Sequence, residues 1–457
     1  MAEEMTKSTK DEIEALRDAL SDGAFGTEGM ADENDAVADE SLVEDFISMF
    51  GVEGATPLKA HDWKAYVPSC LCENSSFSEK IYGLIRPESE SVYIFDAPRF
   101  KTGAYCIGGI GAFDYPQVLM ECNGHGNYMV RGYFDNGELL LMIEDLEDYT
   151  PIPADEHRDP PIPDYAQYPV RIKKYDTVTN LFSRNTGLLE SSAMLDKRAV
   201  LVGCGSVGSF VAMQLARSGV GKFVLCDTDT LEIHNICRHQ CGFDDLGRYK
   251  VDAVKDKILN INPNAEVITY RSIIQRVPED ELMPLLGRNT IIIGGGDNRG
   301  SADWACKLAI KTDSTFVSTG CWTRAFAGEI FYWASGRNLS CYSCALGGLI
   351  DEDRPESHAT YFGSDEEKET LSFEPGIAAD IDFVTIIAVK LALDLLNRDN
   401  ENYTPRVIDY LKQYTWVCNT NNTKIGGPRA AMFPTPLWIT NNLTVNKDAG
   451  CPFCGNK

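Results

Sequence analysis

The chain has 457 residues, enough for two or three domains, and its 44% hydrophobic content is ordinary for a protein with a substantial core. Its formal net charge of −26 argues against nucleic acid as a partner, because phosphate binding needs a basic surface, and against an anionic membrane surface. No stretch is long and apolar enough to span a bilayer, and the acidic N-terminus is unlike a signal peptide, so we expect a cytoplasmic protein. The 15 cysteines are interpreted as buried thiols plus one metal site.

The N-terminal third is predicted to hold a tail and a separate domain. Residues 1–40 are strongly acidic and predict a disordered tail, with partner binding as the alternative. Residues 41–148 predict a smaller, strand-rich accessory domain that recognises a partner. Asn136-Gly137 is a typical hairpin turn between two of its strands. Four strands are expected in this domain, at 92–95, 105–110, 128–134 and 139–143.

Residues 149–174 are rich in proline, acidic residues and tyrosine, a composition that predicts an extended linker. Residues 175–457 then predict a larger α/β domain with a Rossmann-like, doubly wound sheet. Near its start, Arg184 lies in a short polar segment, where a plain surface arginine is one interpretation.

A glycine-rich fingerprint follows the first strand expected in this α/β domain. The apolar run 199–202 is typical of a buried parallel strand, and a helix is predicted over 206–218. Between them, Gly203, Gly205 and Gly208 form the pattern G-x-G-x-x-G. Such glycines allow close backbone approach to phosphate, and the helix N-terminus offers free N–H groups and a positive dipole. By itself the fingerprint is most typical of an NAD or FAD site.

The residues after the second expected strand, 223–226, indicate different chemistry. Asp227 is placed to accept a hydrogen bond from a ribose hydroxyl, and Asp229 follows closely. Polar and cationic residues come next, at Asn235, Arg238, Gln240 and Lys250. A dehydrogenase needs no such cluster, whereas triphosphate chemistry does, because cations must offset charge on the phosphates as pyrophosphate departs.

A second polar segment follows the fourth expected strand, 290–293, where Asp297 and Asn298 end a run of glycines. Ligands bind at the carboxyl ends of strands in a doubly wound sheet, and a carboxylate there can hold Mg²⁺. A helix-capping aspartate is the alternative. Further strands are expected at 265–270, 314–318, 329–333, 416–418 and 437–443, and a long helix at 376–397.

Two C-x-x-C pairs lie far apart in the sequence. Cys341 and Cys344 form the first pair, and Cys451 and Cys454 the second. Four such thiolates make a tetrahedral site for structural Zn²⁺. Redox-active dithiols are the alternative.

Together these motifs resemble the ThiF/MoeB superfamily, which includes the ubiquitin-activating enzymes, from about residue 181 onward. The resemblance implies that the three glycines line an ATP site, that Asp227 holds the ribose and that Asp297 is the Mg²⁺ and catalytic aspartate. It implies phosphate contacts from Asn235, Arg238 and Lys250, and places Gln240 at the family's glutamine position. In relatives, the arginine corresponding to Arg184 reaches into the neighbouring protomer's ATP site, which implies a homodimer.

The function implied by this resemblance is ATP-dependent adenylation of the C-terminal carboxylate of a ubiquitin-like protein, the first step of a bacterial ubiquitin-like conjugation pathway. A conjugating enzyme would then be a further partner. Two alternatives are adenylation of a sulfur-carrier protein in cofactor biosynthesis and modification of a peptide C-terminus. A third, an NAD-dependent oxidoreductase, is disfavoured by Arg238, Lys250 and Asp297.

Residues 345–375 resemble the loop that crosses over the ATP site in relatives. This loop contains no cysteine, so we predict that the substrate is not held there as a thioester. Cys321 is the most plausible thiol elsewhere, and Ser357 beside His358 offers a hydroxyl on the loop itself.

Overall fold

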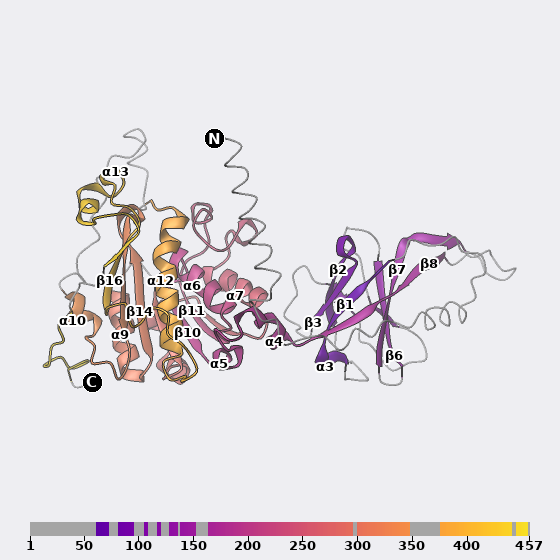
Figure 1. Cartoon of the computed structure of the whole chain (residues 1–457), viewed down its shortest axis with the longest axis horizontal. Coiled ribbons are helices and arrows are strands. Elements are labelled where there is room, and N and C mark those ends of the chain that lie inside the picture. Colours follow the sequence, from indigo (N-terminus) through magenta and orange to yellow (C-terminus); the bar gives the residue numbers. More distant parts are fainter. Residues whose placement is uncertain are drawn as a thin grey trace, which may run out of the picture. The chain divides into compact units, whose positions relative to one another are not determined.

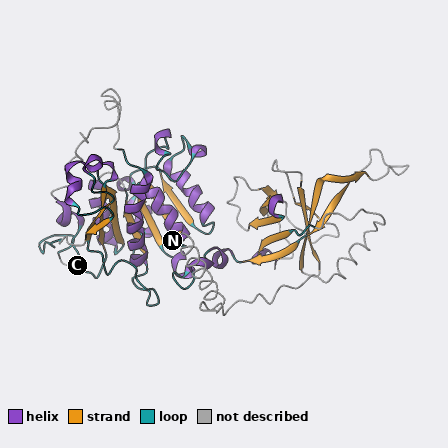
Figure 2. Ribbon diagram, turned by 45° about the horizontal axis from the view of Figure 1, so that its top comes forward, coloured by secondary structure: helices purple, strands orange, loops and turns teal. Residues whose placement is uncertain are grey.

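The computed structural model describes residues 61–72, 81–95, 105–107, 117–119, 128–135, 138–151, 163–295, 299–347, 375–440 and 445–455. The expected acidic tail, 1–40, and most of the expected crossing loop lie outside these residues. No helix within the described ranges is long and apolar enough to cross a membrane. Figure 1 labels the elements, and Figure 2 distinguishes helices from strands.

The N-terminal part contains two sheets that share a core around Trp63, Ile94 and Ile143. The strands of the five-stranded sheet are, in spatial order, β4 (Tyr105–Ile107), β2 (Ile81–Arg86), β3 (Ser91–Phe95), β1 (Lys64–Pro68) and β9 (Arg171–Tyr175). Those of the four-stranded sheet are β5 (Gln117–Leu119), β6 (Tyr128–Asp135), β7 (Glu138–Pro151) and β8 (Pro163–Pro169). Two short helical turns, α3 (Ser69–Cys72) and η1 (Pro87–Ser89), follow β1 and β2.

The predicted hairpin is confirmed, because β6 and β7 pair antiparallel with Asp135 opposite Glu138. The linker predicted for 149–174 is wrong where the structure describes it. There, β8 pairs antiparallel with β7, and β9 pairs parallel with β1. Proline misled the composition argument, because β8 is an edge strand with Pro163 and Pro169 at its two ends. Prolines are tolerated in edge strands and at the first residue of a strand.

One eight-stranded sheet organises the C-terminal part. Its spatial order is β12-β11-β10-β13-β14-β15-β16-β17. The first five of these strands run parallel, and β15, β16 and β17 each pair antiparallel with the strand before them in this order. Their bounds in chain order are β10 (Arg198–Val202), β11 (Lys222–Cys226), β12 (Glu266–Tyr270), β13 (Thr290–Gly294), β14 (Thr315–Cys321), β15 (Ala327–Trp333), β16 (Tyr414–Cys418) and β17 (Trp438–Thr440). The predicted α/β class is therefore confirmed, with a mixed rather than wholly parallel sheet.

Helices cover both faces of this sheet (Figures 1 and 2). On one face lie α6 (Ser206–Arg217), α7 (Lys250–Ile261) and α12 (Ala378–Leu396), and on the other lie α8 (Glu279–Leu282), α9 (Arg299–Thr312) and α10 (Tyr342–Leu346). Strand β10 shows why its sequence is continuously apolar. Ala199 and Leu201 pack into the first core, while Val200 and Val202 pack into the second.

The order of the parallel strands creates a switch point at β10, which pairs with β11 on one side and with β13 on the other. Ligands of open α/β sheets bind in the crevice beyond the carboxyl ends of the strands at such a point. The segments that leave β10, β11 and β13 carry the glycine fingerprint, Asp227 and Asp297 respectively. The fold thus brings the glycine fingerprint and Asp227 to the edge of the sheet at which β13 also ends.

Candidate nucleotide site

The glycine loop between β10 and α6 is built for close backbone packing. Gly203 has a φ of 97°, a left-handed conformation that glycine adopts without strain. A Cβ on Gly208 would lie 2.0 Å from the carbonyl oxygen of Gly203, so only a glycine lets the helix approach the loop. After β13, a Cβ on Gly295 would lie 3.4 Å from the Gly208 nitrogen, so the loops after β10 and β13 meet here. Gly205 differs, because a Cβ there would meet no atom within 4 Å.

Asp227, at the end of β11, holds the glycine loop in place. Its Oδ2 accepts a hydrogen bond from the Cys204 N–H at 2.7 Å, and its Oδ1 accepts one from the Asp229 N–H at 2.8 Å. The side chain is half-buried. Because each carboxylate oxygen has a second lone pair, Asp227 can still accept a hydrogen bond from a ligand hydroxyl.

Lys250 and Asp229 form an ion pair beside this carboxylate. Lys250 is the first residue of α7 and is only 9% exposed, and its Nζ lies 2.9 Å from Asp229 Oδ2. Its backbone N–H also donates to the Asp229 carbonyl oxygen, at 2.9 Å. The hydrogen bond from the Lys250 ammonium holds the pKa of Asp229 below its usual range. The ion pair thereby fixes the amino group of a buried lysine at the end of the second parallel strand.

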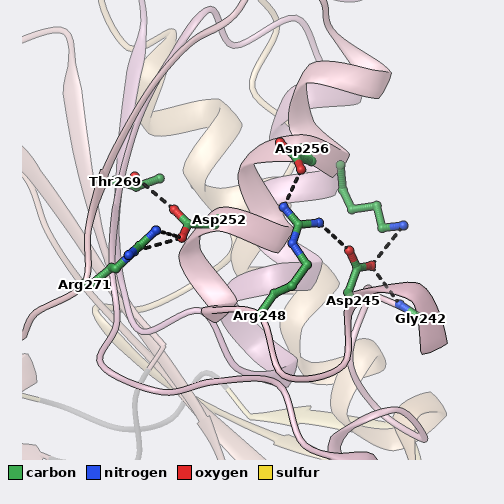
Figure 3. A network of polar contacts seen from close by, with 8 residues as sticks. Gly242, Asp245, Arg248, Asp252, Asp256, Thr269 and Arg271 are labelled. Atoms are coloured by element: carbon green, nitrogen blue, oxygen red, sulfur yellow. Dashed lines mark hydrogen bonds and ion pairs between the residues drawn. The ribbon is translucent and has the colours of Figure 1, made fainter. Parts of the chain in front are cut away.

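A network of ion pairs braces α7 and the segment before it (Figure 3). Asp245 accepts hydrogen bonds from the Gly242 N–H at 3.2 Å and from Arg248 Nη1 at 2.7 Å, and it forms an ion pair with Lys257 at 3.2 Å. Arg248 also pairs with Asp256 on α7. These contacts attach the segment that precedes α7 to the body of the helix, and they therefore hold in place the turn that leads into Lys250.

On the same helix, Asp252 accepts hydrogen bonds from Arg271 Nε at 2.9 Å and from Thr269 Oγ1 at 3.4 Å (Figure 3). Thr269 belongs to β12 and Arg271 follows it. The guanidinium of Arg271 lies over the Tyr249 ring, 4.4 Å from its centroid. Helix α7 is thus also tied to the edge strand of the sheet.

The segment after β11 presents the remaining candidate ligands. Asn235 ends the turn η3 (Ile233–Asn235), where its Oδ1 accepts from the Glu232 N–H at 3.0 Å. Its carbonyl oxygen accepts from the backbone N–H of Arg238 at 3.0 Å. The Arg238 side chain is half-buried. These contacts fix the backbone on either side of the cationic side chain.

The side chain that reaches the glycine loop from this segment is that of His239, which sequence reasoning passed over. His239 Nε2 lies 2.7 Å from the Cys204 carbonyl oxygen, and the ring is buried. Gln240 contacts the same loop region through its backbone, whose N–H donates to Ser209 Oγ at 3.3 Å. The sequence signal was the polar run Arg-His-Gln, but only the fold shows which of these residues faces inward.

Asp297 and Asn298, the expected Mg²⁺ site, lie outside the described residues. The next residue, Arg299, begins α9 and forms a half-buried ion pair with Glu329 on β15, at 3.1 Å. Glu329 also accepts hydrogen bonds from Trp322 Nε1 at 3.1 Å and from the Tyr414 hydroxyl at 2.7 Å. This cluster fixes the start of α9 two residues beyond Asp297, and no local sequence pattern had indicated it.

Arg184 lies on the turn η2 (Ser183–Asn185), where it is exposed. The turn is held to α6 by Asn185, whose Nδ2 donates to the Arg217 carbonyl oxygen at 3.1 Å. Arg217 ends α6, at the opposite end of the helix from the glycine loop. This position is compatible with donation to a neighbouring protomer.

The four cysteines of the two C-x-x-C pairs come together. All four sulfur atoms lie within 4.8 Å of one another, with 3.7 Å between Cys341 and Cys451 and 3.8 Å between Cys344 and Cys454. Thiolates bind Zn²⁺ at about 2.3 Å, so a tetrahedral set has sulfur–sulfur edges of about 3.8 Å. The geometry therefore fits a zinc ion bound by four thiolates.

The fold is that of an α/β protein with a glycine loop at the switch point of its sheet, and its family is identified by sequence. The chain matches the ThiF family over residues 179–423, more than half of its length, and belongs to that family. The predicted superfamily is thereby confirmed.

Three relatives illustrate the range of proteins to which the chain is similar. Ubiquitin-like modifier-activating enzyme 5 from Caenorhabditis elegans is 27% identical over 168 residues, which cover 34% of this chain and 39% of that enzyme. Molybdopterin-synthase adenylyltransferase from Salmonella typhimurium is 28% identical over 172 residues, covering 35% and 63% respectively. The tRNA threonylcarbamoyladenosine dehydratase of Bacillus subtilis is 39% identical over 94 residues, covering 20% and 37%. The chain thus spans less than two thirds of each of these relatives.

Among solved structures, that of E. coli MccB with ATP superposes with a TM-score of 0.43 at 17% identity, covering 60% of this chain and 74% of that one.

Proposed function

We propose that this protein uses Mg–ATP to adenylate the C-terminal carboxylate of a ubiquitin-like protein. The observation that carries the proposal is the convergence of the glycine loop, Asp227 and the Lys250–Asp229 pair at the switch point of the sheet. Membership of the ThiF family and the names of its relatives, an activating enzyme for a ubiquitin-like modifier and an adenylyltransferase, support it.

In this proposal, a carboxylate oxygen of the substrate attacks the α-phosphorus of ATP, and the bond to the bridging oxygen breaks to release pyrophosphate. The glycine loop receives the phosphates, and Asp227 accepts from the ribose. Lys250 exchanges part of its contact with Asp229 for the phosphates, while Arg238 and Asn235 donate from the opposite segment. Because the backbone segments that carry these donors are held in place before ATP arrives, only side chains need to move for the donors to stabilise developing charge.

Asp297 is proposed to ligate the Mg²⁺ that enters with ATP, with Asn298 beside it. Carboxylates are preferred ligands of Mg²⁺ at phosphate sites. The test is carboxylate-dependent exchange of pyrophosphate into ATP. Asp297→Ala and Arg238→Ala should each lower the exchange rate by roughly two to three orders of magnitude, as loss of a transition-state donor does. Arg217→Ala, at the far end of α6, is the matched control. Wild-type exchange rates in both site variants would contradict the assigned roles.

A second substrate, a sulfur-carrier protein, is favoured by the similarity to molybdopterin-synthase adenylyltransferase, of which the chain covers 63%. Both substrate classes present a C-terminal carboxylate, so the chemistry at the site would be the same. Pyrophosphate exchange measured with each candidate protein in turn would separate them. Peptide modification stays a further alternative.

We also propose that the four-cysteine cluster binds one structural Zn²⁺. Cys341 and Cys344 flank the start of α10, and Cys451 and Cys454 lie close to the C-terminus. Zinc would tie this last segment to the core beneath α9, where Cys341 and Cys454 are fully buried. A homodimer in which Arg184 is donated between protomers is proposed as well.

A further inference from the structure

His239 connects the glycine loop to the segment that carries Arg238. The proposed nucleotide site needs both segments to be correctly placed relative to each other. His239 follows Arg238 directly, and its ring reaches under the glycine loop to Cys204. Cys204 is thereby held at both of its backbone polar groups, because its N–H donates to Asp227 and its carbonyl oxygen meets His239. The ring is 8% exposed, so water does not compete for these contacts.

Both ring nitrogens of His239 are engaged, and the partners determine where the proton lies. The Cys241 N–H can only donate, and it points at Nδ1 at a distance of 3.1 Å. Nδ1 must therefore be the unprotonated nitrogen. The Cys204 carbonyl oxygen can only accept, and it lies 2.7 Å from Nε2, so Nε2 carries the proton. These contacts specify one neutral tautomer.

A protonated imidazolium would not fit this arrangement. It carries a hydrogen on each nitrogen, so a hydrogen on Nδ1 would oppose the Cys241 N–H. Either the ring would move or the 239–241 backbone would turn away. Without that partner the buried N–H of Cys241 would be removed from water with no hydrogen bond in exchange, which is unfavourable.

The charged groups around the ring come from several elements. Lys250 on α7 disfavours the imidazolium, whereas Asp227 after β11 and Asp245 on η4 (Phe243–Asp245) favour it. Arg238 is its cationic neighbour in the chain. Burial raises the pKa of the nearby thiols of Cys204, Cys226 and Cys241, so these thiols stay neutral near pH 7. Burial is the largest effect on His239 itself and lowers its pKa below the usual value.

We propose that His239 is a positioning residue that fastens the glycine loop to the Arg238 segment, and that its protonation releases this fastening and weakens nucleotide binding. The inference rests on the proposed nucleotide site. It predicts a site that is competent at neutral pH and loses affinity as the solution becomes acidic.

The first test needs no nucleotide. In protein labelled with ¹⁵N-histidine, long-range ¹H–¹⁵N spectra report the tautomer and titration of each ring, and His239→Gln assigns the signal. We expect an Nε2-protonated neutral ring that titrates below the usual histidine range. An Nδ1-protonated ring, or an ordinary exposed titration, would overturn the inference.

The second test is calorimetric titration with Mg–AMPCPP at pH 8.0 and pH 5.5. Wild-type affinity should fall on acidification by more than the fall seen in the matched variant, and this extra loss should grow as the pH approaches the value at which the spectra show His239 titrating. His239→Leu, which can make neither contact, should bind weakly at both pH values. Glutamine can donate from Nε2 and accept at Oε1 without titrating, so His239→Gln should restore binding at pH 8.0 and retain it at pH 5.5.

The His239→Gln variant experiences every other effect of pH on the nucleotide and the protein just as wild-type protein does. It is therefore the reference against which the pH dependence of wild-type binding is measured. Equal loss of affinity in wild type and His239→Gln would overturn the proposed release. Absence of binding by wild-type protein at pH 8.0 would instead contradict the proposed nucleotide site, while the spectra would still decide the tautomer and titration of His239. Circular dichroism of each variant at both pH values checks that the fold persists.

Discussion

Two glycines of the same loop should respond to alanine in opposite ways. At Gly208, the added Cβ would lie 2.0 Å from the Gly203 carbonyl oxygen and 2.9 Å from its carbon, both of them backbone atoms. Real Cβ contacts essentially never fall below 3.0 Å, so α6 and the loop must separate by the difference, about 1 Å. Overpacking of this kind costs roughly 1–3 kcal/mol. At Gly205, the Cβ meets nothing within 4 Å and φ is −72°, so alanine adds no strain there.

Differential scanning calorimetry and nucleotide titration together separate the two roles. Gly208→Ala should lower the melting temperature by about 2–4 °C for each kcal/mol lost, as expected for a domain of a few hundred residues. Gly205→Ala should leave the melting temperature unchanged but weaken ATP binding, because its methyl group occupies the space through which phosphate would approach the backbone. An unchanged melting temperature for Gly208→Ala, or an equal fall for both variants, would refute the packing argument.

Three further predictions concern other parts of the chain. Purified protein should contain close to one zinc ion per chain by elemental analysis, depleted in Cys341→Ser and retained in Cys237→Ser; a folded protein without metal would rule the site out. Asp394→Asn should lower the free energy of unfolding, measured by urea titration, by about 1–3 kcal/mol. The buried carboxylate of Asp394 accepts hydrogen bonds from three consecutive backbone N–H groups, and an amide cannot satisfy all three. An unchanged free energy of unfolding would show that these bonds are not stabilising. Mixing Arg184→Ala with Asp297→Ala protein should restore part of the exchange activity if protomers share sites, and no rescue between exchanging subunits would place Arg184 outside the partner's site.

Local patterns predicted much of the α/β domain. The apolar runs at 199–202 and 290–293 are strands buried on both faces, so their sequence shows them directly. The glycine spacing predicted the loop and α6, in which Val207, Val211 and Leu215 form a buried stripe at helical spacing.

The sequence was least informative where structure depends on distant pairing. Strand β8 forms by pairing with β7, whereas the proline content of its own sequence indicated a linker. The role of His239 depends on Cys204, which lies 35 residues earlier in the chain. Likewise Arg299 and Glu329 meet only because β15 returns antiparallel beside β14. A pairwise contact of this kind leaves no local pattern for a single sequence to display.

The predicted absence of a thioester on the crossing loop stays a prediction, because residues 348–374 lie outside the described part of the chain. Cys321, at the end of β14, is half-buried. The measurement is a denaturing gel without reductant after incubation with ATP and the substrate protein. We expect no adduct that reductant cleaves, and such an adduct, lost in Cys321→Ala, would overturn the prediction. An adduct that resists reductant but is cleaved by hydroxylamine would instead indicate an oxyester on a loop hydroxyl such as that of Ser357.

The central claim is that ATP is consumed by attack of a protein carboxylate on its α-phosphate. The most direct measurement is exchange of labelled pyrophosphate into ATP, with a candidate ubiquitin-like protein that ends either in a free carboxylate or in a carboxamide. We predict exchange with the free carboxylate, none with the carboxamide, and loss of exchange in Arg238→Ala. Exchange that is equally fast with the carboxamide, or absent with every carboxylate-ended protein of both candidate substrate classes, would contradict the account.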